Sequence, residues 1–364
     1  MIVNPLMAGY SISLHATEAA AGLTGGIMYL GSLFTRPAAG HLADRISKYR
    51  LTMAGLLIMA VSFAGYLISG NVYLLDVWRV MSGIGYSICS IAITTWIAQL
   101  FDRDHVGQGM GFYGMINAVA MATAPMIASV LEKAGGFRLA FSFAILFLIF
   151  SFILIQFVRN RGKSLQTQKE ADQEMDRHPI VLRSVVPIAL IIMLFTIPFF
   201  ATSSFIYEYM NIRNPGLNAA LFFPFYAGFL LILRMSLKNQ FDKKPFGLFL
   251  WFSLISSVLC CICLTWPLNL AVLILSGFFM AGGYGIMCSE CQSTAILLAK
   301  PEESGLANST YYIGIDCGLM LGPVIGGQLM EFLPIDWFYP CLVLTALGIA
   351  LVYSLNRKKL SKVH

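Results

Sequence analysis

Apolar runs of about 20 residues recur along most of the chain, and short polar segments separate them. A helix needs about 20 apolar residues to cross a hydrocarbon core about 30 Å thick, so the pattern predicts membrane-spanning helices. We expect these at about residues 19–42, 50–70, 73–99, 107–131, 137–158, 185–208, 216–238, 246–266, 268–297, 304–331 and 335–355. The chain is therefore predicted to be an all-α integral membrane protein with eleven full spans.

The first apolar segment, residues 1–12, is shorter than the others. As a helix it would reach about 18 Å, which is less than the thickness of the hydrocarbon core. We therefore expect the first helix of the fold to be truncated at the N-terminus.

The composition indicates a membrane protein without a separate soluble domain. Hydrophobic residues make up 58% of the 364 residues and charged residues 12%, whereas soluble proteins carry about 25% charged residues. The expected organisation is an N-terminal helix bundle (1–158), a cytoplasmic linker (159–184), a C-terminal helix bundle (185–355) and a basic cytoplasmic tail (356–364).

Basic residues are distributed unequally between the two sets of loops. Twenty Lys and Arg residues, Arg36 and Arg234 among them, lie in or beside the loops on one side, and only Lys133, Arg138 and Arg213 lie on the other. Because cytoplasmic loops carry the excess of Lys and Arg, the linker and the C-terminus are placed in the cytoplasm. We expect a multi-pass protein of the plasma or inner membrane, whose net charge of +6 implies no nucleic-acid partner.

An internal repeat relates the two halves of the chain at a constant offset of 198 residues. The matched pairs are Arg36 with Arg234, Asp44 with Asp242, Arg45 with Lys243, Gly85-Tyr86 with Gly283-Tyr284, Gly107 with Gly305, and Pro125 with Pro323. Several coincidences at one offset indicate a duplicated helical unit.

A charged segment between two apolar runs, Gly40 to Arg50, has the spacing G-x-L-A-D-R-x-x-(K/R)-x-(R/K). It resembles the loop between helices 2 and 3 of the major facilitator superfamily (MFS) of transporters. The resemblance implies two pseudo-symmetric six-helix bundles and a gating role for this corner and its second copy. The gating residues would be Gly40, Asp44, Arg45, Lys48, Arg50 and, in the second copy, Asp242. The alternative is a basic anchor at the cytoplasmic surface.

Arg79 is the basic residue within an expected span. Its surroundings resemble the family's fourth-helix motif L-x-x-x-R-x-x-Q-G-x-G, with Ser82 in place of Gln. An Arg inside the hydrocarbon region needs a partner or a wet cavity, and in the family it is linked to proton handling. The alternative is an Arg that extends to the interface and pairs with Asp76 three residues earlier.

Glu290 and Asp316 are the acidic residues deepest in apolar sequence. Intramembrane acids are functional sites by default, so we expect at least one to couple protons or contact substrate. The alternative is a carboxyl group that joins two helices by a hydrogen bond. Tyr312, Tyr207 and Asn4 are further candidates for a central cavity.

Small residues around two prolines form the third family mark. Gly318, Gly322, Pro323, Gly326 and Gly327 follow the pattern G-x3-G-P-x2-G-G, and a copy with Ala and Ser surrounds Pro125. Small residues let helices approach closely. In relatives that export compounds the fifth-helix version is the antiporter motif, although helix packing alone also explains the pattern.

No enzymatic site, metal site or cofactor site is expected. The cysteines of Cys288-x2-Cys291 lie in an apolar run without histidine ligands nearby, which favours small apolar core residues. Gly83-x-Gly85 follows no strand and has no Walker-type lysine.

We therefore expect a secondary active transporter resembling the twelve-helix drug:proton antiporters. Its predicted activity is proton-coupled efflux of a small drug-like or amphipathic solute by alternating access, as a monomer in the lipid bilayer. Two alternatives stay open: an importer or facilitator of a sugar, amino acid or organic acid, and a truncated product that does not transport.

Overall fold

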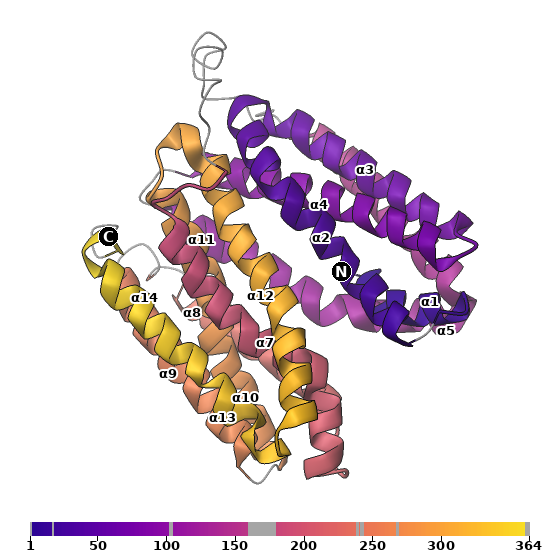
Figure 1. Ribbon diagram of the computed structural model, residues 1–364. Helices are drawn as coiled ribbons and strands as arrows, with labels where there is room; N and C mark the ends of the chain where they lie inside the picture. Colours follow the sequence, from indigo (N-terminus) through magenta and orange to yellow (C-terminus); the bar gives the residue numbers. More distant parts are fainter. Residues whose placement is uncertain are drawn as a thin grey trace. The chain divides into compact units, whose positions relative to one another are not determined.

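A computed structural model describes residues 2–16, 18–101, 105–158, 180–237, 240, 244–266 and 269–360. Over these ranges the secondary structure is helical, without strands, as the sequence predicts (Figure 1). Two compact units emerge. Unit 1 comprises residues 1–99, 123–182 and 300–310, and unit 2 comprises residues 100–122, 183–299 and 311–364.

Eight helical segments in the described part of the chain are long and apolar enough to cross a membrane. They are Lys48–Ile68, Val72–Leu100, Val130–Gln156, Val186–Ile206, Phe246–Thr265, Leu270–Leu297, Pro301–Phe332 and Ile335–Leu360. The shorter apolar helix α8 covers Phe222–Leu237. These spans correspond to eight of the eleven expected ones, with ends that differ by up to seven residues, and α8 lies within a ninth.

Unit 1 is built mainly from η1 (Asn4–Leu6), α1 (Met7–Ser13), α2 (Glu18–Arg45), α3 (Lys48–Ile68), α4 (Val72–Leu100) and the second part of α5 (Val106–Gln156). The N-terminal helices are part of its core. The hydroxyl of Tyr10 donates to the carbonyl of Tyr66 over 2.9 Å, and the Tyr10 ring packs against Phe141 at 5.0 Å between centroids. Residues 4–13 are thus packed against α3 and α5.

Helix α5 contains a break where the sequence predicts two helices at 107–131 and 137–158. Gly135 and Gly136 have non-helical dihedral angles, and Gly136 has a φ of 69°. This left-handed region suits glycine, which has no Cβ to clash. The two predicted helices therefore exist, but only these two residues separate them.

Unit 2 contains α7 (Val186–Arg213), η3 (Ala219–Leu221), α8, α9 (Phe246–Thr265), α10 (Leu270–Met280), α11 (Ile286–Leu297), α13 (Phe338–Leu342) and α14 (Leu344–Leu360). A π-helical turn, η4 (Ala281–Gly285), joins α10 to α11 within one predicted span. Single π turns inside α-helices are frequent at functional sites. Helix α14 continues to Leu360, so the first residues of the predicted basic tail are helical.

Helix α12 (Ser304–Phe332) follows η5 (Pro301–Glu303) and contributes to both units. Its residues 304–310 belong to unit 1, and the rest belongs to unit 2. Helix α5 is also divided between the units: its residues 106–122 belong to unit 2, and the rest belongs to unit 1.

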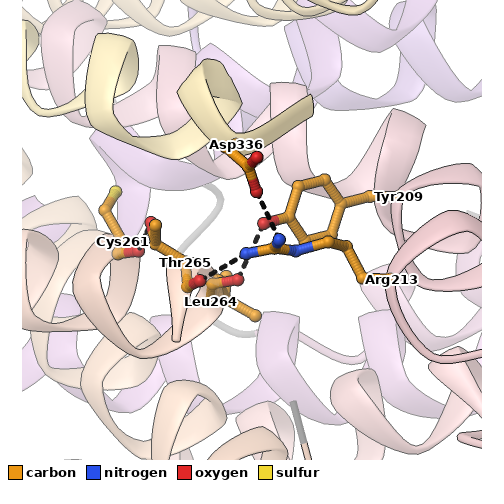
Figure 2. A network of polar contacts seen from close by, with 6 residues as sticks. All are labelled: Tyr209, Arg213, Cys261, Leu264, Thr265 and Asp336. Atoms are coloured by element: carbon orange, nitrogen blue, oxygen red, sulfur yellow. Dashed lines mark hydrogen bonds and ion pairs between the residues drawn. The ribbon is translucent and has the colours of Figure 1, made fainter. Parts of the chain in front are cut away.

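A polar network joins three elements at one end of unit 2 (Figure 2). Arg213 at the end of α7 pairs with Asp336 of η6 (Ile335–Trp337), and its Nη2 donates to the carbonyl of Thr265 over 2.6 Å. The hydroxyl of Tyr209 donates to the carbonyl of Leu264 over 2.9 Å. These bonds satisfy carbonyl groups at the end of α9, which its own helix leaves without donors.

Candidate functional site

Arg79 of α4 lies in the interior of unit 1, with 1% of its surface exposed. Its Nε donates to the carbonyl of Thr24 over 3.1 Å and its Nη2 to the carbonyl of Gly25 over 2.8 Å. Nη1 donates to Oδ1 of Asn4 over 3.0 Å. The guanidinium therefore joins α4 to α2 and η1, and two of the candidates from the sequence, Arg79 and Asn4, are in direct contact.

In the structure Arg79 does not pair with Asp76, which was the alternative interpretation of the sequence. Asp76 accepts a hydrogen bond from the hydroxyl of Thr24 over 2.7 Å, and Arg79 forms no ion pair within the described ranges. Ser82, which replaces the Gln of the motif, donates to the carbonyl of Arg79 over 2.7 Å and accepts from Tyr66 over 2.6 Å. Tyr66 was not predicted, because nothing near it in the sequence marks a polar partner.

Asp44 bonds to the start of helix α12 within unit 1. One carboxylate oxygen accepts from the backbone N–H of Gly305 over 2.6 Å and the other accepts from Leu306 over 3.0 Å. The first N–H groups of a helix have no partner within it and carry partial positive charge. Asp44 therefore supplies both the acceptors and the negative charge that this helix end needs.

Gly40 allows α2 and α12 to approach at this corner. A Cβ on Gly40 would lie 2.6 Å from the Cβ of Ser309 and 3.0 Å from the carbonyl oxygen of Gly305. The hydroxyl of Ser309 donates to the carbonyl of Arg36 over 2.6 Å, and the amide of Asn308 donates to Thr95 over 3.1 Å. A side chain at residue 40 would force these contacts apart.

The charged residues of the Gly40–Arg50 segment differ in burial. Lys48 is buried with 0% exposure, whereas Arg45 is half-buried and Arg50 is exposed. Asp44 lies at the corner, outside the apolar spans, and burial raises its pKa to about 7. The N–H groups of Gly305 and Leu306 and the charge of Lys48 act against that shift, and Glu303 adds to it. Asp242, its counterpart in the repeat, lies outside the described residues.

Arg36 and Arg234, which the sequence places in or beside loops, are buried side chains within helices. Arg36 in α2 has 0% exposure, donates to the hydroxyl of Ser90 over 2.7 Å and lies over the ring of Tyr86 at 5.6 Å. Arg234 in α8 has 3% exposure. The loop pattern alone could not distinguish them from surface charges, but their pairing at the 198-residue offset was a signal of shared structure.

Glu290 and Asp316 are buried in unit 2, with 0% and 3% exposure. Glu290 lies in α11, one turn after the π-helical turn, and Asp316 lies in α12. Tyr312, one turn before Asp316, accepts a hydrogen bond from the amide of Gln292 over 3.1 Å. Tyr207 lies in α7, but its side chain is outside the part that the structure describes.

The glycines of α12 face helix α7 at very short range. A Cβ on Gly318 would lie 2.7 Å from the carbonyl oxygen of Met193, and one on Gly322 would lie 2.8 Å from that of Ile197. A Cβ on Gly326 would meet the ring of Phe205 at 2.9 Å, whereas Gly327 has only ordinary contact. Pro323 lies inside α12, and Pro125 lies in α5 with its side chain outside the description.

The described residues hold no group of three or more His, Cys, Asp or Glu side chains that could bind a metal. The described polar features of the interior include the buried guanidinium groups of Arg36, Arg79 and Arg234 and the buried carboxyl groups of Glu290 and Asp316.

Comparison with known sequences gives matches along the chain. A family model described as the Major Facilitator Superfamily matches residues 1–295 and 243–363. The uncharacterized MFS-type transporter YhhS of Escherichia coli K12 is 29% identical over 126 residues, which are 32% of this chain and 31% of YhhS. The chain thus matches less than a third of the length of that relative. Multidrug resistance protein 1 of Bacillus subtilis is 22% identical over 354 residues, covering 96% of this chain and 90% of that protein.

Solved structures with the same arrangement of helices are transporters. A bacterial homologue of the iron transporter ferroportin, in an outward-facing state, has a TM-score of 0.77 at 15% identity and covers 98% of this chain and 95% of that one. The human organic anion transporter MFSD10 has a TM-score of 0.75 at 15% identity, with 97% and 88% covered. At such identities the similarity shows the fold alone. The family match along the sequence and this fold together establish that the chain belongs to the Major Facilitator Superfamily of membrane transporters.

Proposed function

We propose that this MFS transporter exports a small drug-like or amphipathic solute and that protons drive the export. The observation that carries the proposal is the burial of two carboxyl groups, Glu290 and Asp316, in the helices of unit 2. Carboxyl groups inside membrane-spanning segments are rare and mark functional sites by default. A carrier driven by protons needs such a group, because its protonation has to change with the state of the transport cycle.

The direction of transport is proposed from sequence similarity. The relative that covers most of this chain among those described above is named a multidrug resistance protein. Export is also consistent with the small-residue pattern around Pro323, which α12 uses to pack against α7. The linker and the C-terminus would be cytoplasmic, since most basic loop residues lie on that side.

Asp44 would act in the cytoplasmic gate. Its bonds to Gly305 and Leu306 hold the first turn of α12 against α2. Breaking these bonds exposes two N–H groups and a carboxylate, which water then solvates. The corner is therefore able to form and break with a modest change in free energy, as alternating access requires.

Reconstitution in liposomes tests the coupling. The purified chain is placed in vesicles that contain a pH-sensitive dye, and proton flux is recorded when Hoechst 33342 is added with and without a pH gradient. We expect Glu290→Gln or Asp316→Asn, or both, to abolish substrate-dependent proton flux, because each removes a group that carries the proton.

The control is Glu331→Gln. It removes a carboxylate at an exposed position of α12, the helix that also holds Asp316. It should leave the flux unchanged. Unchanged coupling in both buried variants would contradict the proposal. Counterflow of a sugar, amino acid or organic acid in vesicles without a pH gradient would favour an importer or facilitator instead.

A further inference from the structure

The side chain of Arg234 has hydrogen-bond donors that the described parts of the chain do not use. It projects from α8 into the interior of unit 2, where 3% of its surface is exposed. Nη2 donates to the carbonyl of Gly285 over 2.7 Å. Nε and Nη1 are buried without a hydrogen-bond partner, and the side chain forms no ion pair within the described ranges.

This is unlike Arg36 and Arg79, the two other buried arginines among the described residues. Arg79 uses all three guanidinium nitrogens, and Arg36 bonds Ser90 and lies over Tyr86. A buried charge without a counter-ion is strongly unfavourable, and buried N–H groups without acceptors add to that cost. An anion at this position would relieve both costs.

Several groups near Arg234 are aromatic. Cys288, Tyr226, Tyr311 and Tyr284 lie close to its guanidinium. The ring of Tyr284 stacks on Phe199 with centroids 4.4 Å apart and an interplanar angle of 20°, and Tyr226 lies 5.2 Å from the same Phe199 ring. The π-helical turn Ala281–Gly285 supplies both Tyr284 and the carbonyl that holds Nη2. Such rings suit the apolar or aromatic part of an organic molecule.

We propose that unit 2 contains a binding site for the carboxylate of an aromatic organic anion, with Arg234 as its cationic anchor. The site deepens the proposed export function, on which it rests, by adding monoanionic aromatic compounds to the proposed substrates. A single guanidinium balances one negative charge. A phosphate dianion would keep an uncompensated charge in the same buried place, whereas guanidinium and carboxylate groups match in geometry.

Gly114 gives a way to disturb Arg234 without removing its charge. It lies in the part of α5 that belongs to unit 2, and a Cβ there would collide with Nη1 and Cζ of Arg234 and lie 2.5 Å from the hydroxyl oxygen of Ser289. Gly114→Ala should therefore displace the guanidinium. Gly228→Ala on α8 is the matched control, since a Cβ at residue 228 would meet nothing within 4 Å.

The test measures binding to the full chain in lipid nanodiscs by isothermal titration calorimetry. The probes are phenylacetate and phenylacetamide, which differ in charge but hardly in shape. We expect phenylacetate to bind and phenylacetamide to bind at least about tenfold more weakly, because the amide lacks the charge-assisted pair. Arg234→Gln and Gly114→Ala should abolish the preference for phenylacetate, and Gly228→Ala should retain it.

Each variant is also checked for its thermal unfolding midpoint, so that a loss of binding is attributed only to folded protein. Failure of wild-type protein to prefer phenylacetate, or an unchanged preference in folded Arg234→Gln, would overturn the site. Proton-coupled transport of Hoechst 33342 by the same purified protein, reconstituted in liposomes, separates the two proposals. If that transport persists while phenylacetate does not bind, export stands and the anion site fails. If phenylacetate binds through Arg234 without coupled transport, the site stands and the export mechanism fails.

Discussion

Three buried arginines illustrate how one residue type serves different purposes in the described part of the chain. Arg36, Arg79 and Arg234 lie in α2, α4 and α8 with at most 3% exposure. Arg36 bonds a serine hydroxyl among its contacts, Arg79 bonds two carbonyls and an asparagine, and Arg234 bonds a single carbonyl. A guanidinium stays charged at any pH of interest, so the two unused donors of Arg234 are the basis of the proposed anion site.

Replacing Arg79 by Lys should destabilise unit 1. A lysine has all its donors on one nitrogen and does not reach Thr24, Gly25 and Asn4 together. Each lost hydrogen bond to a charged group costs about 1.5–3 kcal/mol, so the unfolding midpoint of Arg79→Lys in detergent should fall clearly below that of the wild type. Tryptophan fluorescence during heating measures this midpoint.

The matched control is Arg50→Lys, the same substitution at an exposed position of α3. It should leave the midpoint within experimental error. Equal midpoints for the two variants would mean that the bonds of Arg79 contribute nothing to stability.

At the scale of the element, the sequence predicts helices better than their internal details. A span needs a long apolar run, so α3, α9 and the second part of α5 are visible as patterns. The π-helical turn at Ala281–Gly285 is not, because it changes the hydrogen bonding without changing the hydropathy. The partners of Arg36 and Arg234 lie more than 50 residues away in the chain, so no local pattern reveals their burial.

Asp44, at the α2–α3 corner, bonds to the N-terminus of α12. Removing its carboxylate should release that helix end. In Asp44→Ala the N–H groups of Gly305 and Leu306 lose their acceptors, so their exchange with deuterium should become faster. Mass spectrometry of a peptide that contains residues 300–312 measures the rate.

In the wild-type protein, the deuterium exchange rate of these N–H groups should depend on pH more than the intrinsic pH dependence of amide exchange explains. The pKa of Asp44 is raised to about 7 in the docked corner, above its ordinary value, so the docked form binds more protons. Docking is therefore strongest at low pH and weakens as pH rises from about 4 to about 7. Asp44→Asn keeps an acceptor oxygen but does not titrate, and its corrected rate should be independent of pH. A pH-dependent rate in Asp44→Asn would assign the effect to another group, such as Glu303 or Lys48.

At the scale of the whole molecule, the halves of the sequence and the units of the structure do not coincide. The first turn of α12 belongs with α2 and α4 in unit 1, and residues 100–122 belong with unit 2. The sequence repeat predicted two similar halves. It could not predict this exchange, because the segments that change unit, 100–122 and 300–310, overlap at the 198-residue offset and so leave the repeat pattern unaltered. Each half of the chain therefore lacks a segment that completes its own unit.

Fragments cut within the polar linker should consequently need each other. We expect residues 1–168 and 169–364, expressed together with a tag on one fragment, to purify as a pair, because the bonds from Asp44 to Gly305 and Leu306 join them within unit 1. A Cβ on Gly305 would collide with the carbonyl oxygen of Gly40 and lie 2.8 Å from Asp44. Gly305→Ala should therefore lower the yield of the pair, whereas Gly70→Ala, where a Cβ would meet nothing within 4 Å, should not. Equal yields for the two variants would place the association elsewhere than at this corner.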